Sequence, residues 1–313
     1  MPRALVNAQS SPPIEVEYET FGNAADPALL LVVGFTAQLT MWPVQFCEML
    51  AAQGLQVIVF DNRDCGLSTK LDGVTVDVEQ VMMAALTEQP HLLPPVPYTL
   101  SDMAADAVGL LDHLGIETAH VAGASMGGMI AQTIAIEHPH RTRSLVSIMS
   151  TPGDPDVSTP TPEAASALLD PPPTERAAFI ENSVRSLVWQ SKRYADADRV
   201  RTQAGLDFDR SFYPEGSARQ LAAIYASGSR APLLPALRTP TLVIHGHDDT
   251  LFPVAAAERT ASLIDAAHLL ILSDMGHDLP EPQWPLVTGV IAAHAALADR
   301  SGINQRSTAC PVH

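Results

Sequence analysis

Short, continuous runs of apolar residues recur along this 313-residue chain, and they constrain its fold more than any other feature. Continuous apolar strands are typical of a sheet that is buried on both faces, and such sheets are mostly parallel. The segment 15–20 instead alternates between polar and apolar residues, as a half-buried strand does. The continuous runs lie at residues 28–33, 55–60, 120–122, 144–149, 241–244 and 269–272.

Helical patterns lie between these runs. The strongest covers Leu100–Leu114, where apolar residues recur at helical spacing, and we expect Ser101 to cap its start and Gly115 to end it. Because strands alternate with helices, the chain is predicted to be an α/β protein with a mostly parallel, doubly wound sheet. The other helical patterns lie at residues 43–52, 127–138 and 284–298.

Two segments interrupt the alternation. The first, residues 69–98, contains one helical pattern at 78–86 and then a proline-rich stretch. The second, residues 151–237, begins rich in proline and threonine, becomes helical from Pro171 onward and contains no buried strand. A long segment of this kind between two strands of a sheet indicates an insertion.

These patterns predict how the chain is divided. Residues 1–150 and 238–300 are expected to form one α/β core, and residues 151–237 an inserted helical cap. The polar, unpatterned end, residues 301–313, is predicted to be a disordered tail.

The chain is acidic, with 18 Lys and Arg residues against 35 Asp and Glu residues and a formal charge of −17. Phosphate binding needs a positive surface, so we expect no nucleic-acid partner and no strong attraction to anionic membranes. No apolar stretch approaches the roughly 18 residues of a membrane span, and the first fifteen residues do not resemble a secretory signal. We therefore predict a soluble cytoplasmic protein without stable membrane insertion.

The motif Gly123-Ala-Ser125-Met-Gly127 lies directly after an apolar run and directly before a helical pattern. A sharp turn from strand to helix exposes a serine hydroxyl, and glycines two residues to either side relieve the crowding. The helix behind the serine directs backbone N–H groups toward developing negative charge. The motif alone is a weak signal, but its setting makes Ser125 a candidate nucleophile.

A serine nucleophile needs a base and an acid that orients the base, and both are predicted at later strand ends. The run 241–244 leads into His245-Gly-His247-Asp248-Asp249, and the run 269–272 leads into Met275-Gly276-His277. We expect His277 to be the general base and Asp249 the orienting acid. Asp248 is the alternative acid; the spacing from Gly246 to Pro253 favours Asp249.

Metal chemistry is not expected. The segment His245–Asp249 resembles the start of a His-x-His-x-Asp-His zinc motif, but Thr250 stands where the last ligand belongs. Cys47, Cys65 and Cys310 have neither metal-ligand spacing nor a disulfide framework, so we interpret them as free thiols. No metal and no cofactor is predicted.

A carbonyl attacked by serine develops a negative oxygen, which two N–H donors stabilise. The residue after the nucleophile, Met126, is expected to give one backbone N–H, and the loop Val33-Gly34-Phe35 the other, from Phe35. The alternative interpretation of this loop is a tight turn that needs Gly34 and has no catalytic role.

With these residues in view, the chain resembles the α/β-hydrolase superfamily over roughly Glu15–Ala298, and within it the aclacinomycin methylesterase-like and mycobacterial-type carboxylesterase branch. The segments that carry the resemblance are Ala28–Trp42, Phe60–Ser68, Gly123–Gly128, Pro240–Asp249 and Met275–His277.

The resemblance also shows two departures. Val33 stands where many relatives have His, and Asp64 stands where many have Gly. The family pattern implies that Asp61 and Arg63 brace the loop that follows the second apolar run. A serine nucleophile separates the chain from the superfamily's dehalogenases and epoxide hydrolases, which use Asp.

The resemblance implies a carboxylic ester hydrolase that acts through an acyl-enzyme on a small-molecule ester. A lactonase, a thioesterase or a cofactor-free perhydrolase would use the same three residues, and a ligand-binding receptor on this scaffold is the alternative outside enzymes. Trp189, Tyr213, Tyr225 and Met82 are the candidate substrate-binding residues. Whether the chain forms a homodimer is left open.

Overall fold

The computed structural model describes residues 2–307, and within them lies one eight-stranded sheet with the strand order β1-β2-β4-β3-β5-β6-β7-β8. β1 and β2 pair antiparallel, as do β2 and β4, and every later pair is parallel. The predicted mostly parallel sheet is confirmed. The strands are β1 (Arg3–Asn7), β2 (Ile14–Phe21), β3 (Ala28–Val32), β4 (Gln56–Phe60), β5 (Ala119–Ala124), β6 (Thr142–Ile148), β7 (Thr241–Gly246) and β8 (His268–Leu272).

The central strands are continuous apolar runs because both faces of the sheet are covered. In β3, the side chains of Leu30 and Val32 join one apolar cluster, whereas Leu29 and Leu31 join the cluster on the opposite face. Successive side chains of a strand point to opposite faces. When both faces are buried, every position of the strand favours an apolar residue. β8 lies at the edge of the sheet, and its Leu269 is 40% exposed.

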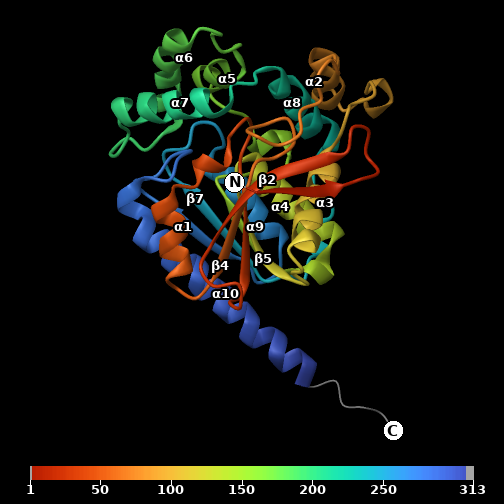
Figure 1. Ribbon diagram of the computed structural model, residues 1–313, viewed down its shortest axis with the longest axis vertical. Coiled ribbons are helices and arrows are strands. Elements are labelled where there is room, and N and C mark those ends of the chain that lie inside the picture. Colours follow the sequence, from red (N-terminus) through yellow and green to blue (C-terminus); the bar gives the residue numbers. More distant parts are fainter. Residues whose placement is uncertain (1, 308–313) are drawn as a thin grey trace.

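Helices pack on both faces of this sheet (Figure 1). α3 (Leu100–His113) and α4 (Met126–Glu137) cover one face, and α1 (Val44–Ala51) and α10 (Trp284–Ser307) cover the other. α9 (Val254–Leu263) connects β7 to β8 and contacts both. This arrangement is the predicted doubly wound fold.

The segment between β6 and β7 is helical and contains no strand among the described residues. We call residues 151–237 the helical insertion; it holds α5 (Pro162–Leu169), α6 (Arg176–Ser183), α7 (Ala197–Ser211) and α8 (Glu215–Ser227). These helices gather over one end of the sheet, with α2 beside α8 (Figure 1). That they form a separate domain stays a prediction.

The remaining elements are short. α2 (Val78–Leu86) lies between β4 and α3 and coincides with the helical pattern predicted there. The 3-10 turns are η1 (Leu39–Met41), η2 (Pro90–Leu92), η3 (Pro139–Arg141), η4 (Pro155–Val157), η5 (Val184–Trp189), η6 (Leu234–Ala236) and η7 (Glu281–Gln283). No helix within residues 2–307 is long and apolar enough to cross a membrane.

The predicted cap of α3 is wrong by two residues. Thr99 caps the helix, and Thr99 and Asp102 form a reciprocal capping box in which each side chain accepts the other's backbone N–H. The Ser101 hydroxyl instead donates to Glu137, 2.6 Å away. Gly115, with φ of +69°, follows the end of the helix as predicted.

α10 continues to Ser307, into the segment for which a disordered tail is predicted. Once a helix is formed, each further residue costs little, and Gly302 is the only Gly or Pro between Ala298 and Pro311. The rest of that tail, residues 308–313 with Cys310, lies outside the described residues.

His120 is a buried histidine of β5 whose charge the fold disfavours. Its ring Nδ1 lies 2.8 Å from the Ser144 hydroxyl, and its Nε2 lies 3.4 Å from the Asp299 carboxylate. Burial lowers the pKa of His120 to about 4, although the Asp299 carboxylate opposes this shift. Between pH 6.5 and about 4 the unfolded chain therefore binds a proton that the folded chain does not, so stability falls as the pH falls.

We expect His120→Asn to flatten this dependence. Each pH unit in that window costs the folded state about 1 kcal/mol through this one site. Urea unfolding at pH 7 and pH 5 measures the loss; wild type is expected to lose more stability than the variant between the two. Equal losses would show that His120 takes up its proton as readily in the folded protein as in the unfolded chain.

Candidate active site

Ser125 occupies a strained turn between β5 and α4. Its backbone angles are φ 57° and ψ −122°, a combination that residues other than glycine rarely adopt. Both flanking glycines are required by space. A Cβ on Gly123 would lie 2.0 Å from the Gly127 carbonyl oxygen, and a Cβ on Gly127 would lie 2.2 Å from the Val32 oxygen.

Two hydrogen bonds from β6 and its following loop hold this turn. The Ser125 N–H donates to the Ile148 carbonyl at 3.0 Å, and the Ser150 hydroxyl donates to the Ser125 carbonyl at 2.8 Å. The side chain of Ser125 is half-buried. The turn therefore presents the serine at the carboxyl end of the sheet without closing it off.

His277 and Asp249 come together at the same end of the sheet, as the sequence predicts. The His277 Nδ1 lies 2.7 Å from the Asp249 Oδ2, and Asp249 is buried. The other carboxylate oxygen, Oδ1, accepts the N–H groups of Leu251 and Phe252, both at 2.8 Å. An ionised carboxylate only accepts, so Nδ1 carries the proton and the His277 Nε2 is left with a lone pair.

Asp248, the alternative acid, points elsewhere. Its Oδ2 accepts the Lys192 N–H at 3.0 Å, and its Oδ1 lies 3.3 Å from the Lys192 ammonium. Of the two neighbouring carboxylates, the structure thus pairs Asp249 with His277 and Asp248 with the helical insertion.

The helical insertion also braces the loop that carries His277. The His277 N–H donates to the Trp189 carbonyl at 2.6 Å, and a Cβ on Gly276 would lie 2.2 Å from that same oxygen. The Asp278 Oδ1 accepts the N–H groups of Gly276 and Ser191. Trp189 therefore contributes its main chain here. The bracing role of Asp278 was missed in the sequence, and its only signal is its place next to His277.

Two backbone N–H groups are available beside Ser125. A Cβ on Gly34 would lie 3.3 Å from the Ser125 Cβ, so the loop after β3 packs directly against the turn that carries Ser125. Within residues 2–307 the Phe35 N–H has no acceptor. Met126 is the first residue of α4, and such N–H groups have no partner inside the helix.

The other predicted pocket residues are not linked to this site. The Tyr213 hydroxyl donates to Asp72 at 2.8 Å and accepts from Arg219 at 2.7 Å. Tyr225 and Met82 are half-buried, on α8 and α2. Within the described chain, no hydrogen bond or ring contact joins any of the three side chains to the serine, histidine or carboxylate above.

The loop after β4 is held by ion pairs. Arg63 makes a two-pronged contact with Asp106, at 2.6 and 2.7 Å, and both are buried. The Asp61 carboxylate accepts the N–H groups of Leu39 and Leu67. These contacts agree with the bracing role that the family resemblance implied.

Asp64, the departure from the family's glycine, keeps a glycine-like backbone with φ of 62°. Its carboxylate makes a two-pronged ion pair with Arg219 of α8, with both distances 2.8 Å. Asp64 thereby ties the loop after β4 to the helical insertion.

His245 belongs to the support of Asp249. It is fully buried, its Nε2 donates to the Phe252 carbonyl at 2.8 Å, and burial lowers the pKa of this histidine. His247 is exposed. Among residues 2–307, no group of three or more His, Cys, Asp or Glu side chains is arranged to hold a metal ion.

Comparisons with known proteins agree with this architecture. Rhodomycin D methylesterase DnrP of Streptomyces peucetius is 28% identical over 307 residues, which cover 90% of this chain and 94% of that protein. The enol-lactonase from Burkholderia xenovorans LB400 has a TM-score of 0.71 at 23% identity and covers 94% of this chain and 100% of its own. A thermophilic esterase from Thermogutta terrifontis has a TM-score of 0.67 at 24% identity, and the match covers 96% of this chain and 99% of that one.

Because both solved structures are less than 25% identical to this chain, they show a shared fold and nothing further. The family described as alpha/beta hydrolase fold matches residues 27–281, which include the strands β3 to β8 and the helical insertion between β6 and β7. The chain therefore belongs to the alpha/beta hydrolase fold family, as its sequence predicted.

Proposed function

We propose that the protein hydrolyses carboxylic esters through an acyl-enzyme formed on Ser125. The observation that carries the proposal is the 2.7 Å contact between His277 and Asp249 at the sheet end where the strained turn presents the serine. Membership of the family and the likeness to a rhodomycin D methylesterase support it. The substrate is expected to be a small, uncharged ester. Residues 151–237 are expected to act as a cap that covers it, and the protein is expected to be cytoplasmic.

The first half of the reaction forms the acyl-enzyme. The Ser125 oxygen attacks the ester carbonyl while the His277 Nε2 takes its proton. The carbonyl oxygen becomes negative and accepts the N–H groups of Phe35 and Met126. When the tetrahedral intermediate collapses, the bond to the alcohol oxygen breaks and His277 returns the proton to that alcohol.

The second half releases the acid. Water attacks the acyl carbonyl while His277 accepts its proton, and the same two N–H groups stabilise the second oxyanion. The bond to the Ser125 oxygen then breaks, and the serine recovers its proton from His277. Asp249 remains ionised throughout and keeps the imidazole in the tautomer that has a free Nε2.

The proposal is tested by covalent labelling. A fluorophosphonate reacts with serines that have a base and an oxyanion site, and we expect peptide mass mapping to find the adduct on Ser125. His277→Gln is expected to suppress the labelling. Ester, thioester and lactone substrates are then compared, and turnover of esters is expected to be fastest.

Each other outcome has a definite meaning. An adduct outside Ser125 contradicts the proposed nucleophile. Faster turnover of lactones or thioesters replaces the substrate class and keeps the mechanism. Labelling at Ser125 without turnover of any substrate favours a ligand-binding receptor on this scaffold.

A further inference from the structure

The turn that follows β3 contains a strained residue next to Phe35. Thr36 has φ of 57°, and such an angle is unusual for a β-branched side chain. Strain of this kind persists only where the surrounding structure holds it. The Ala37 N–H donates to the Gly34 carbonyl at 3.3 Å, so Thr36 is the third residue of a turn, a position that usually takes glycine at positive φ.

Gln220 of α8 holds the N–H of this strained residue. Its Oε1 accepts the Thr36 N–H at 2.9 Å, and its Nε2 donates to the Arg63 carbonyl at 2.9 Å. Gln220 is 1% exposed. Because both ends of the amide are used in a buried place, its orientation is fixed and either contact is costly to lose.

The carbonyl side of the turn is held by Cys65. Its Sγ lies 3.1 Å from the carbonyl oxygens of both Thr36 and Ala37. Burial raises the pKa of the Cys65 thiol, so the thiol stays protonated and donates its hydrogen. The turn is thus held at its carbonyl groups by Cys65, in the loop after β4, and at the Thr36 N–H by Gln220 of the helical insertion.

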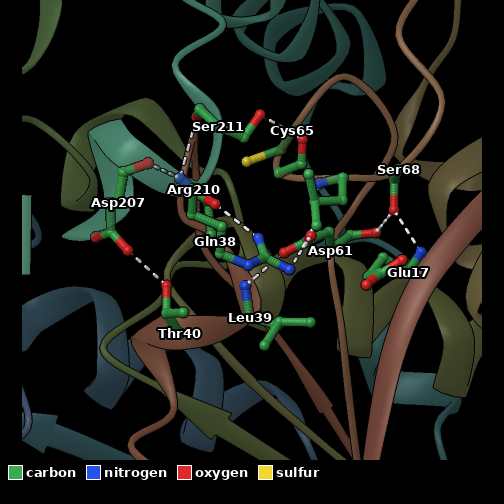
Figure 2. Close-up of polar contacts among 12 residues, drawn as sticks. Glu17, Gln38, Leu39, Thr40, Asp61, Cys65, Ser68, Asp207, Arg210 and Ser211 are labelled. Atoms are coloured by element: carbon green, nitrogen blue, oxygen red, sulfur yellow. Dashed lines mark hydrogen bonds and ion pairs between the residues drawn. The ribbon is translucent and has the colours of Figure 1, made fainter. Parts of the chain in front are cut away.

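The end of α7 holds the next part of the same loop (Figure 2). The Gln38 Nε2 donates to the carbonyls of Asp207 and Ser211, at 2.7 and 3.1 Å, and Arg210 donates to the Gln38 Oε1 at 2.6 Å. Arg210 also pairs with the buried Asp61 at 2.8 Å. Two helices of the insertion, α7 and α8, therefore hydrogen-bond to the loop that contains Phe35.

We propose that Gln220 is a positioning residue for the oxyanion donor Phe35. An unstrained turn is reached by rotating the peptide group between Phe35 and Thr36, and the bond to Gln220 blocks that rotation because it holds the Thr36 N–H. Without Gln220 the backbone around Phe35 relaxes, and its N–H no longer points steadily at the oxyanion. The inference rests on the proposed function, since it assigns that N–H a role in ester hydrolysis.

Gln220→Met tests this role with a side chain of similar length that cannot hydrogen-bond. Loss of one oxyanion donor costs about 10²–10³-fold in kcat, and a mispositioned donor less. On p-nitrophenyl butyrate we expect kcat to fall about 10–100-fold with KM within about twofold of wild type. The midpoint of the pH profile should stay unchanged, because His277 and Asp249 are untouched.

Two further variants separate positioning from general damage to the insertion. Gln220→Glu keeps an acceptor for the Thr36 N–H and should retain more activity than Gln220→Met. Arg185→Gln is the matched control, because Arg185 bonds only Ser166 and Asp170 within the insertion and is expected to leave kcat unchanged.

Binding measurements test the oxyanion directly. A trifluoromethyl ketone forms a hemiketal oxyanion on the serine, whereas butyrate binds without one. Gln220→Met should weaken the ketone in proportion to its loss in kcat/KM and leave butyrate unchanged. A rise in KM with unchanged kcat, or equal weakening of both ligands, would assign Gln220 to substrate binding and overturn the proposal.

A readout without catalysis keeps the test independent of the proposed function. Labelling with ¹⁵N-phenylalanine gives at most eight amide signals, one of them from Phe35. Gln220→Met is expected to shift the Phe35 signal and speed its hydrogen exchange, whereas Arg185→Gln is not. If wild type hydrolyses no ester, the proposed function fails; if the Phe35 signal is unchanged in Gln220→Met, the positioning role fails.

Discussion

Replacing Ser125 with alanine is expected to lower kcat about 10⁶-fold, the size of loss seen when a serine nucleophile is removed. Alanine keeps the Cβ and the backbone of the turn but has no oxygen to attack the carbonyl. Substrate affinity should remain, because the substitution removes one hydroxyl and leaves the surrounding backbone and side chains in place. Turnover of the best ester, fluorophosphonate labelling and product binding are the three measurements. A loss in kcat below about 10²-fold would mean that another residue carries the attack.

Ser125→Gly serves as the companion variant, because it removes the proposed nucleophile and the backbone strain together. At φ 57° and ψ −122° a residue with a Cβ carries about 1–3 kcal/mol of strain. Glycine relieves that strain, although its greater freedom in the unfolded chain offsets about 0.5–1 kcal/mol. We expect Ser125→Gly to be more stable to urea than Ser125→Ala by about 1 kcal/mol. If Ser125→Gly is instead less stable than Ser125→Ala by about 0.5–1 kcal/mol, the entropy cost of glycine acts alone and the turn is not strained.

The placement of the candidate triad follows from local sequence and strand order. Ser125, Asp249 and His277 each follow an apolar run, and parallel strands bring such positions to one edge of the sheet. The 2.7 Å contact between Asp249 and His277 is the outcome of that rule. The choice between Asp248 and Asp249 needed the structure, because both carboxylates stand in the same loop.

The support of the site could not be predicted in this way. Gln220 and Thr36 are 184 residues apart, and nothing in a helical pattern says which polar side chain will meet a distant turn. Trp189 was selected for its aromatic ring, yet its carbonyl holds His277. Contacts made by main-chain atoms carry no residue preference, so a sequence does not reveal them.

Local patterns also misjudged the ends of elements. Ser101 was predicted to cap α3 because serine is a good N-cap. Thr99 caps the helix instead, because its reciprocal bonds with Asp102 satisfy two backbone groups at once. β1 was missed altogether, since five residues in a Ser- and Pro-rich setting become a strand only by pairing with β2. Such elements depend on their partners, and periodicity is too short-ranged to show them.

Asp249→Asn is expected to lower kcat about 10⁴-fold without disturbing the fold. The Asp249 Oδ1 accepts two backbone N–H groups, from Leu251 and Phe252, so the asparagine oxygen should take that place. Its NH₂ group then faces the His277 Nδ1 and donates to it. The ring proton moves to Nε2, and His277 can no longer accept the serine proton.

Asp248→Asn is the matched control one residue away. It removes the ion pair with Lys192, whose ammonium is exposed, and is expected to keep kcat within about twofold of wild type. The pair of variants decides which carboxylate orients the base, because each substitution is isosteric and each lies in the same loop. A large loss in Asp248→Asn with activity kept in Asp249→Asn would reverse the assignment. If both variants lose activity equally, the loop itself would be the shared cause, and unfolding curves of the two proteins would then differ from that of wild type.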